Sequence, residues 1–329
     1  MNTFPEPTPL PRELRPLDIP YLHHLEGVAV NPVFVMGLHR SGTTVLSICM
    51  LATGHFNTTT MYHMLYRRCL LHLHFHPAEA AARRQELADY FRSRNLVTRK
   101  YDGIAVGPDA PEEYGEALER KGRRPLLNPQ NLPSFLELAR KIQFIEGQDR
   151  LLLLKNPWNA QHFLYLAQAF PTARFVFIHR RPLQIIDSQI RMFASLLQEK
   201  NEYELLLVDW YGELFQQPLK LKLGQWLYSE SSPYLYWKIV RHVIRTCDYI
   251  EAHRQELGSR AIDITYDELC AQPQLTMRRV MDFLGVSPAV EPDYAQFIAP
   301  RTRPLLPRVA RNQAKIDRRS QHYCQTFGV

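Results

Sequence analysis

The stretch "NPVFVMGLHRSGTTVLSICMLA", residues 31–52, decides the expected fold. Residues 32–36 form a short apolar run typical of a buried strand, and residues 43–52 have the composition of a helix. Between them, "GLHRSGTT" keeps the two glycines of the phosphate-loop pattern G-x-x-x-x-G-K-[ST], but Thr43 replaces the lysine. A strand, a glycine loop and a helix in this order predict an anion site at the helix N-terminus.

The absent lysine changes the chemistry that this loop can support. In nucleotide hydrolases that lysine neutralises the β and γ phosphates, and the next Ser or Thr holds magnesium. No apolar strand of this sequence ends in Asp, the usual second anchor for the metal. The loop amides depend only on the glycines and the fold, and Arg40 brings a positive charge with bidentate geometry. We therefore expect an anion site that requires no metal.

The composition is that of a folded, globular chain. Of 329 residues, 45% are hydrophobic and 22% are charged, and the formal net charge of +7 favours an anionic partner. The five cysteines are widely separated, the N-terminus has no basic start with an apolar run, and no segment approaches the length of a membrane span. These features predict a soluble, cytoplasmic protein with no stable membrane insertion.

Further along the chain, apolar segments of strand length alternate with helical patterns. This alternation predicts an α/β fold of the P-loop-hydrolase-like, three-layer kind, with a central parallel sheet flanked by helices. We expect a single domain over residues 1–329, with an N-terminal arm (1–29) and a catalytic core (30–329). The expected strands are 150–156, 173–180 and 261–266, and the expected helices are 61–75, 80–96, 159–170, the long region from about 183 to 257, and finally 276–285.

Several motifs, in the same order along the chain, resemble those of one enzyme family. "GLHRSGTT" resembles the 5′-phosphosulfate loop of the sulfotransferases that use 3′-phosphoadenosine 5′-phosphosulfate (PAPS), and "FIHRRPLQIIDSQIRMF" resembles their 3′-phosphate motif. "LLLLKNP" is similar to the strand that carries their active-site lysine. "ITYDELCAQPQLTMRRVMDFLGV" resembles the family's Y-E-D-L…P…FLG segment, and "SQHYCQTFGV" is similar to the C-terminal ending of the bacterial-type branch. Earlier in the chain, "DAPEEYGEAL" resembles the acidic P-Q-E-D-E-x-A-L stretch of the same branch.

The resemblance implies PAPS as the co-substrate, no metal, and transfer of a sulfuryl group to an acceptor hydroxyl or, less readily, an amine. Adenosine 3′,5′-bisphosphate is then released. Lys155 would be the active-site lysine. The implied nucleotide contacts are Arg40, Ser41, Gly42, Thr43 and Thr44 at the 5′-phosphate, Arg180 and Ser188 at the 3′-phosphate, and Tyr266 near the adenine.

The sequence also departs from the family pattern. Arg181 stands where many members have an acid or asparagine, and Tyr114 replaces the second acid of the acidic stretch. The glycine-bearing phosphate loop near the end of the cytosolic animal enzymes is not visible. Arg301, Arg303 and Arg311 are candidates to replace it.

An acceptor hydroxyl needs a group that removes its proton. Glu113 is the first candidate because it aligns with a glutamate of the family's acidic stretch and lies in a proline-bounded segment. Glu112 is the adjacent alternative, His63 is the second candidate, and His55 is the third.

Two clusters have weaker functional interpretations. His72, His74 and His76 are spaced two apart, which on a helix spreads the rings over different faces and disfavours a metal site. The aromatic group comprising Trp210, Tyr211, Trp226, Tyr228, Tyr234, Tyr236 and Trp237 predicts core packing, with part of it available to line an apolar acceptor pocket.

The acceptor is not encoded in any motif. We expect a small molecule, a glycan or a lipid and no nucleic acid, and the oligomeric state stays open. Two other functional interpretations compete: a non-catalytic module that binds a phosphorylated ligand or nucleic acid, and a divergent ATP-dependent kinase.

Overall fold

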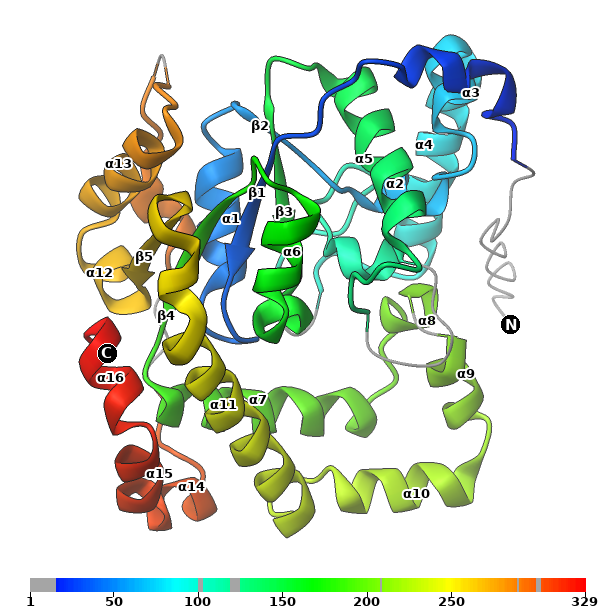
Figure 1. Cartoon of the computed structure of the whole chain (residues 1–329). Helices are drawn as coiled ribbons and strands as arrows, with labels where there is room; N and C mark the ends of the chain where they lie inside the picture. The colour runs from blue at the N-terminus through cyan, green and yellow to red at the C-terminus, as the bar shows by residue number, and fades with distance from the viewer. Residues whose placement is uncertain (1–15, 100–102, 119–124, 208, 289, 300–302) are drawn as a thin grey trace.

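Five parallel strands form the centre of the molecule. The computed structural model describes residues 16–99, 103–118, 125–207, 209–288, 290–299 and 303–329. In it the strand order is β2-β3-β1-β4-β5, and helices cover both faces of the sheet (Figure 1). This confirms the predicted α/β fold. The strands are β1 (Pro32–Met36), β2 (Phe56–Thr58), β3 (Leu151–Lys155), β4 (Arg174–His179) and β5 (Ala261–Thr265).

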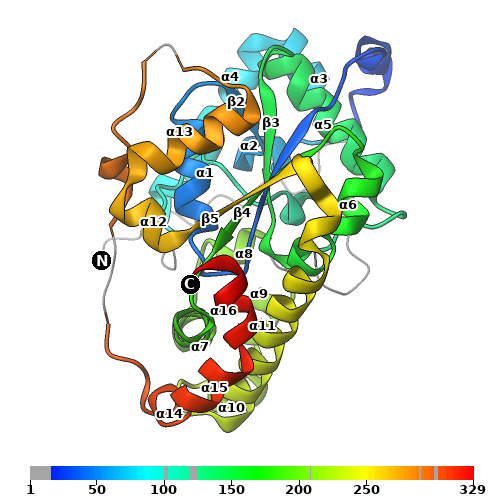
Figure 2. The ribbon, with the colours of Figure 1, turned by 60° about the vertical axis from the view of Figure 1, so that its left-hand side comes forward.

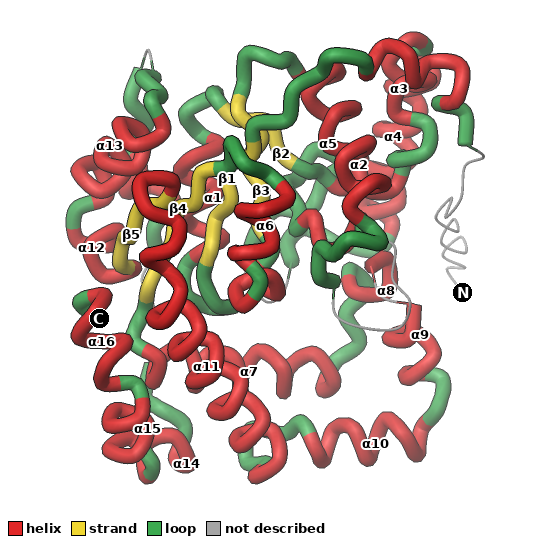
Figure 3. Tube along the Cα trace, viewed as in Figure 1, coloured by secondary structure: helices red, strands yellow, loops and turns green. Residues whose placement is uncertain are grey.

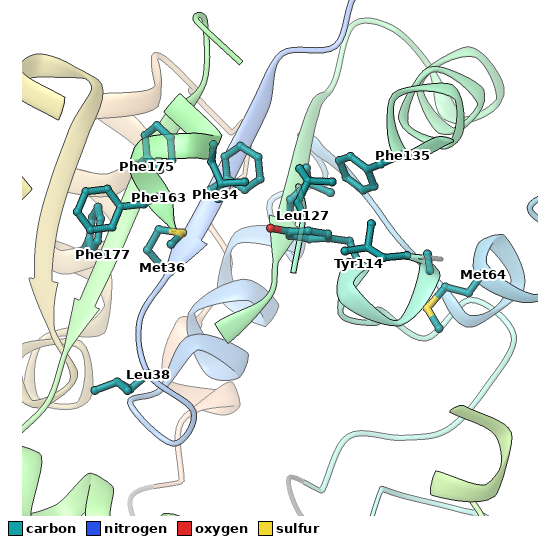
Figure 4. Packing of buried hydrophobic residues seen from close by; sticks show 14 of the residues in the cluster. Phe34, Met36, Leu38, Met64, Tyr114, Leu127, Phe135, Phe163, Phe175 and Phe177 are labelled. Atoms are coloured by element: carbon teal, nitrogen blue, oxygen red, sulfur yellow. The ribbon is translucent and has the colours of Figure 1, made fainter. Parts of the chain in front are cut away.

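The alternation of side chains along β1 explains the three layers. Val33 and Val35 face one apolar cluster, which includes side chains of α1 (Thr43–Leu51) and α13 (Pro273–Leu284). Phe34 and Met36 face the other cluster, and Figure 4 shows them among Phe163, Phe175 and Phe177. Because all five residues of β1 are buried, this strand reads as a continuous apolar run rather than an alternating one.

The helical regions are more divided than the sequence predicts. The expected helix 61–75 is interrupted by a turn. Over its described residues, which omit 208, the region 183–257 forms five α-helices, with prolines at the starts of the first and the last two. The helices around the sheet are α2 (Met61–Leu65), α3 (Leu70–Phe75), α4 (Pro77–Ser93), α5 (Leu132–Glu146), α6 (Phe163–Ala169), α7 (Pro182–Gln198), α8 (Glu204–Leu207), α9 (Asp209–Phe215), α10 (Pro218–Leu227), α11 (Pro233–His253) and α12 (Tyr266–Ala271).

The chain ends in a helical segment that the sequence analysis did not predict. Helices α14 (Pro307–Arg311), α15 (Gln313–Arg319) and α16 (Gln321–Phe327) follow α13, and α16 lies beside α11 (Figure 2). Short 3-10 turns complete the fold: η1 (Ile19–Leu25), η2 (Tyr114–Ala117), η3 (Pro157–Gln161), η4 (Arg254–Arg260) and η5 (Tyr294–Phe297). Within the described ranges, no helix combines the length and the apolar character that crossing a bilayer requires.

Candidate functional site

The polar residues of interest gather at one edge of the sheet. Because the strands are parallel, their carboxyl ends lie together, and the tube in Figure 3 shows this edge facing α7. The glycine loop follows β1, and Lys155 is the last residue of β3, in register with Val35. Arg180 follows β4 directly, and Tyr266 follows β5. The topology therefore assembles the sequence-predicted residues from four separate segments.

The glycine loop holds a backbone conformation that suits an anion. Arg40 has a φ of 72° and Gly42 a φ of 107°, so both lie in the left-handed region that L-residues seldom adopt. A Cβ atom at Gly42 would lie 2.5 Å from a ring carbon of Tyr266, so only glycine fits there. The loop leads into α1, where the Leu46 amide donates a hydrogen bond to the Gly42 carbonyl at the start of the helix. An α-helix has no internal acceptor for its first amides, so those of Thr43, Thr44 and Val45 point to the helix N-terminus, whereas the Ser41 amide donates to the Leu38 carbonyl.

Lys155 connects the loop with the candidate base. It is 9% exposed, and its Nζ donates to Thr44 Oγ1 at 3.0 Å. The same nitrogen lies 3.3 Å from Glu113 Oε1. The ammonium group thus stands between the predicted 5′-phosphate site and a carboxylate whose side chain is 20% exposed.

The two predicted phosphate sites adjoin. Arg40 Nε donates to Ser188 Oγ at 3.0 Å, and Arg180 Nη1 donates to the Arg40 carbonyl at 3.1 Å. The Arg180 guanidinium also lies 4.3 Å from the centre of the Tyr266 ring. Adenosine 3′,5′-bisphosphate carries both phosphates on one ribose, so its two binding sites must be neighbours. The contact between Arg40 and Ser188 meets this requirement.

The residues fit a bisphosphate in a further respect. Ser41 Oγ is buried and has no hydrogen-bond partner among the described residues, so the loop contains a spare hydroxyl donor. Three cationic side chains, Arg40, Lys155 and Arg180, also contact the loop or adjoin it. Cations beside a buried hydroxyl form a donor set that suits a phosphate ligand.

Sequence reasoning missed two residues that shape the loop. Gln189, which is 1% exposed on α7, donates to the His39 carbonyl at 2.8 Å. His39 packs edge-on against Trp158 with ring centres 4.6 Å apart, and its buried Nε2 has no partner among the described residues. Burial, with the charges of Lys155 and Arg40, lowers the pKa of His39 to about 3. The position of His39 inside the phosphate-loop pattern is the signal that could have drawn attention to it.

The two adjacent glutamates have different surroundings. Glu112 is 5% exposed, and Arg99 Nη1 donates to its two oxygens at 2.8 and 2.9 Å. Tyr203 also donates to Glu112, and Glu112 accepts the Glu113 amide at 2.9 Å. Glu112 is therefore a buried structural anchor that orients Glu113. Of the two, Glu113 is the one that reaches Lys155.

The contacts described for the two histidine candidates do not include Lys155. His63 is 2% exposed at the start of α2, where its Nδ1 accepts the Thr60 amide at 3.3 Å and its Nε2 lies 3.3 Å from Glu146 Oε1. The contact with Thr60 caps the helix and uses Nδ1, and the contact with Glu146 uses Nε2, so both ring nitrogens are occupied. His55 precedes β2 at the opposite, amino edge of the sheet, where its carbonyl pairs with the Leu151 amide. A strand length of about 13 Å separates that edge from Lys155, so the third-choice assignment of His55 as the base is wrong.

The C-terminal helices brace the segment that carries Arg180. His179 is 1% exposed, and its two ring nitrogens lie 2.8 Å from the Tyr323 hydroxyl and 2.9 Å from Asp263 Oδ1. Burial lowers the pKa of His179, although Asp263 opposes the shift. Arg181, which departs from the family pattern, pairs with Asp317 at 2.8 Å. The residues on either side of Arg180 are thus tied to α15 and α16.

Two of the three arginines proposed to replace the missing C-terminal phosphate loop lie in the described part of the chain. Arg301 lies outside the described residues. Arg303 is exposed, and Arg311 donates to the Pro307 carbonyl on α14.

The histidine cluster has ordinary structural contacts. His72 pairs with Glu79 at 3.1 Å, and the rings of His72 and His76 stack 4.1 Å apart. Over the described ranges, no three His, Cys, Asp or Glu side chains gather in a way that could hold a metal ion.

The structure thus combines a parallel α/β sheet with a glycine loop and adjoining cationic side chains at one edge, an arrangement that suits an anionic ligand. Comparison with known proteins gives the family. Residues 32–219, more than half of the chain, match the model described as "Sulfotransferase family". The chain therefore belongs to the sulfotransferase family, and it is an enzyme that transfers sulfate.

Solved structures agree with the fold. The chain is similar to sulfotransferase STF9 from Mycobacterium avium, with a TM-score of 0.60 and 17% identity over 95% of this chain and 80% of the other. It is also similar to sulfotransferase STF1 from Mycobacterium tuberculosis H37Rv, with a TM-score of 0.58 and 17% identity over 92% and 79% of the two chains. A search of curated protein sequences gave no significant match. At this identity the structural neighbours support the fold alone.

Proposed function

We propose that this protein transfers a sulfuryl group from PAPS to an acceptor hydroxyl and releases adenosine 3′,5′-bisphosphate. The observation that carries the proposal is the position of Lys155. Its Nζ lies 3.0 Å from Thr44 of the anion loop and 3.3 Å from Glu113, so one cation spans the donor site and the candidate base. The family match favours sulfuryl transfer over the kinase and the non-catalytic module.

Each group has a role in the proposed reaction. The acceptor oxygen bonds to sulfur in line as the bond from sulfur to the 5′-phosphate oxygen breaks, and that oxygen keeps the bonding pair. Glu113 takes the acceptor proton. Lys155, Arg40 and the α1 amides stabilise the charge that grows on the leaving phosphate. Arg180 and Ser188 hold the 3′-phosphate, and Tyr266 fixes Arg180 against the loop.

The roles of the remaining candidates follow from their contacts. Ser41, Gly42 and Thr43 belong to the 5′-phosphate loop, in which Gly42 allows Tyr266 to approach closely. His63 is less suited to be the base because Thr60 and Glu146 occupy both of its ring nitrogens. The acceptor is a small molecule, a glycan or a lipid.

The test uses the purified chain, PAPS and a panel of alcohols, phenols and amines. Mass spectrometry should find a sulfuryl mass increment on at least one hydroxyl compound and equal release of adenosine 3′,5′-bisphosphate. A thermal-shift comparison accompanies it: the bisphosphate should stabilise the protein in the presence of a chelator, whereas Mg-ATP should not. Stabilisation by Mg-ATP alone would refute the donor assignment.

A further inference from the structure

Helix α10 carries an exposed apolar stripe. Leu219 is 85% exposed, Leu223 56% and Trp226 71%. These positions are spaced i, i+4 and i+7, so they share one face of a helix with about 3.6 residues per turn. The sequence analysis predicted core packing for Trp226, and its exposure contradicts that prediction. Three large side chains of one short helix thus face solvent together.

The stripe faces away from the protein. Gln225 donates to the Leu197 carbonyl of α7 at 2.9 Å, and a Cβ at Gly224 would lie 3.4 Å from the Leu197 side chain. At about 100° per residue, positions 224 and 225 lie on the side of α10 opposite the stripe. Helix α10 therefore uses its other face to pack on α7. The helix itself lies at the lower rim of the molecule in Figures 1 and 2.

Basic side chains flank the stripe. Lys220 and Lys222 are exposed on α10, and by helical geometry they lie on its two sides. On α11, the Lys238 ammonium nitrogen lies 4.8 Å from the centre of the Tyr228 ring. The Arg241 guanidinium lies 5.0 Å from the centre of the Trp237 ring, and Trp237 is 57% exposed. From residue 218 to residue 247 the chain has five lysines and arginines, and Glu230 is its only acid. The surface is thus apolar at its centre and positively charged at its margins.

We infer that this surface, formed by α10 and the first turns of α11, binds the face of an anionic lipid bilayer. Leucine and tryptophan on one side of a helix, with lysines at its borders, suit the boundary between headgroups and acyl chains. The positive charge matches anionic headgroups. A symmetric dimer through the same surface would bring Lys220, Lys222 and Arg241 toward their own copies, which like-charge repulsion disfavours.

The inference does not depend on the acceptor or on the donor. It concerns a helix face that points away from α7, whereas the catalytic proposal concerns the carboxyl edge of the sheet. Binding to vesicles and transfer of a sulfuryl group can therefore fail separately.

The test is sedimentation of the full chain with vesicles of phosphatidylcholine alone or mixed with phosphatidylglycerol. We expect binding to the mixed vesicles only, and release at high salt. Leu219→Glu should weaken binding by more than about tenfold. Lys220→Ala and Lys222→Ala should each weaken it about fivefold. The matched control is Leu275→Glu, because Leu275 is 55% exposed on α13, away from the surface, and this variant should bind as the wild type does.

Three results would overturn the inference. The first is no binding to anionic vesicles by the wild type, and the second is equal binding by Leu219→Glu and Leu275→Glu. The third is a concentration-dependent dimer in size-exclusion chromatography that Leu219→Glu abolishes, because the stripe would then bind a second copy. Substitutions at these exposed positions should leave the melting temperature unchanged, so lost binding cannot be attributed to unfolding.

Discussion

Replacing Lys155 with methionine removes the cation that links the anion loop to Glu113. The ammonium nitrogen lies 3.0 Å from Thr44 Oγ1 and 3.3 Å from Glu113 Oε1, and the residue is 9% exposed. A donor held about 3 Å from a charge that develops in a poorly hydrated site contributes about 3–4 kcal/mol to the transition state. We therefore expect kcat to fall about 10²–10³-fold. The free energy of unfolding should change by less than about 1 kcal/mol, because Glu113 can still be hydrated.

The assay measures release of adenosine 3′,5′-bisphosphate from PAPS, with an acceptor from the panel or with water as the slow acceptor. Lys155→Arg should also lose activity, because a planar guanidinium cannot place one nitrogen where the compact ammonium contacts both Thr44 and Glu113. Chemical denaturation provides the stability control. A kcat within about threefold of wild type in Lys155→Met would refute the role given to this lysine.

Three other substitutions separate the roles of neighbouring groups. Glu113→Gln should lower kcat by about 10²–10⁴-fold with bisphosphate affinity near normal, and loss of that affinity would make Glu113 structural instead. Glu112→Gln removes the carboxylate of the buried pair with Arg99, so the free energy of unfolding should fall by about 3–5 kcal/mol; unchanged urea denaturation would contradict this. His39 has a folded-state pKa of about 3 against an ordinary value of 6.5, so as the pH falls through this window the unfolded chain takes up a proton that the folded chain does not. Wild type should lose about 1.4 kcal/mol per pH unit more than His39→Gln between these values, and parallel stability curves for the two proteins would refute the buried, neutral state.

Much of the sheet could be predicted because its inner strands are apolar runs of four or more residues. The predicted strands 150–156 and 173–180 correspond to the inner strands β3 and β4, and the predicted strand 261–266 corresponds to β5 at one edge. Strand β2 was missed because it has only three residues, Phe56–Thr58, and one of them is the buried Asn57, whose side chain donates to Gln143. An edge strand this short has no period that a sequence pattern can reveal.

The loop and strand-end residues of the site could be predicted because local spacing encodes them. Arg40 lies in the loop after a buried strand and Lys155 is the last residue of another, and the parallel topology brings strand ends together whatever lies between them. The sequence ranks Glu113 before Glu112 by alignment alone, and the physical difference between them depends on Arg99 and Tyr203, which reach Glu112 from other segments. The sequence also did not show that His55 is far from the site. His55 comes directly before β2, and a residue at the start of a parallel strand lies at the edge of the sheet opposite the strands' carboxyl ends.

The prediction of core packing for Trp226 on α10 is wrong for a different reason. Composition predicts that a large aromatic side chain is buried, but Trp226 is 71% exposed, while Tyr211 from the same aromatic group is buried. Trp210 has a side chain outside the described set. Hydrophobicity alone does not tell a core residue from one that binds an external surface.

The central claim is that the carboxyl edge of the sheet binds one nucleotide through two adjoining phosphate sites. Titration calorimetry with adenosine 3′,5′-bisphosphate and with adenosine 5′-monophosphate, both with a chelator present, tests it directly. The account predicts that the wild type binds the bisphosphate more than about tenfold more tightly, and that Arg180→Ala removes this difference, because hydrogen bonds to a charged phosphate are each worth about 1.5–3 kcal/mol. Equal affinities in the wild type, or an undiminished difference in Arg180→Ala, would contradict it.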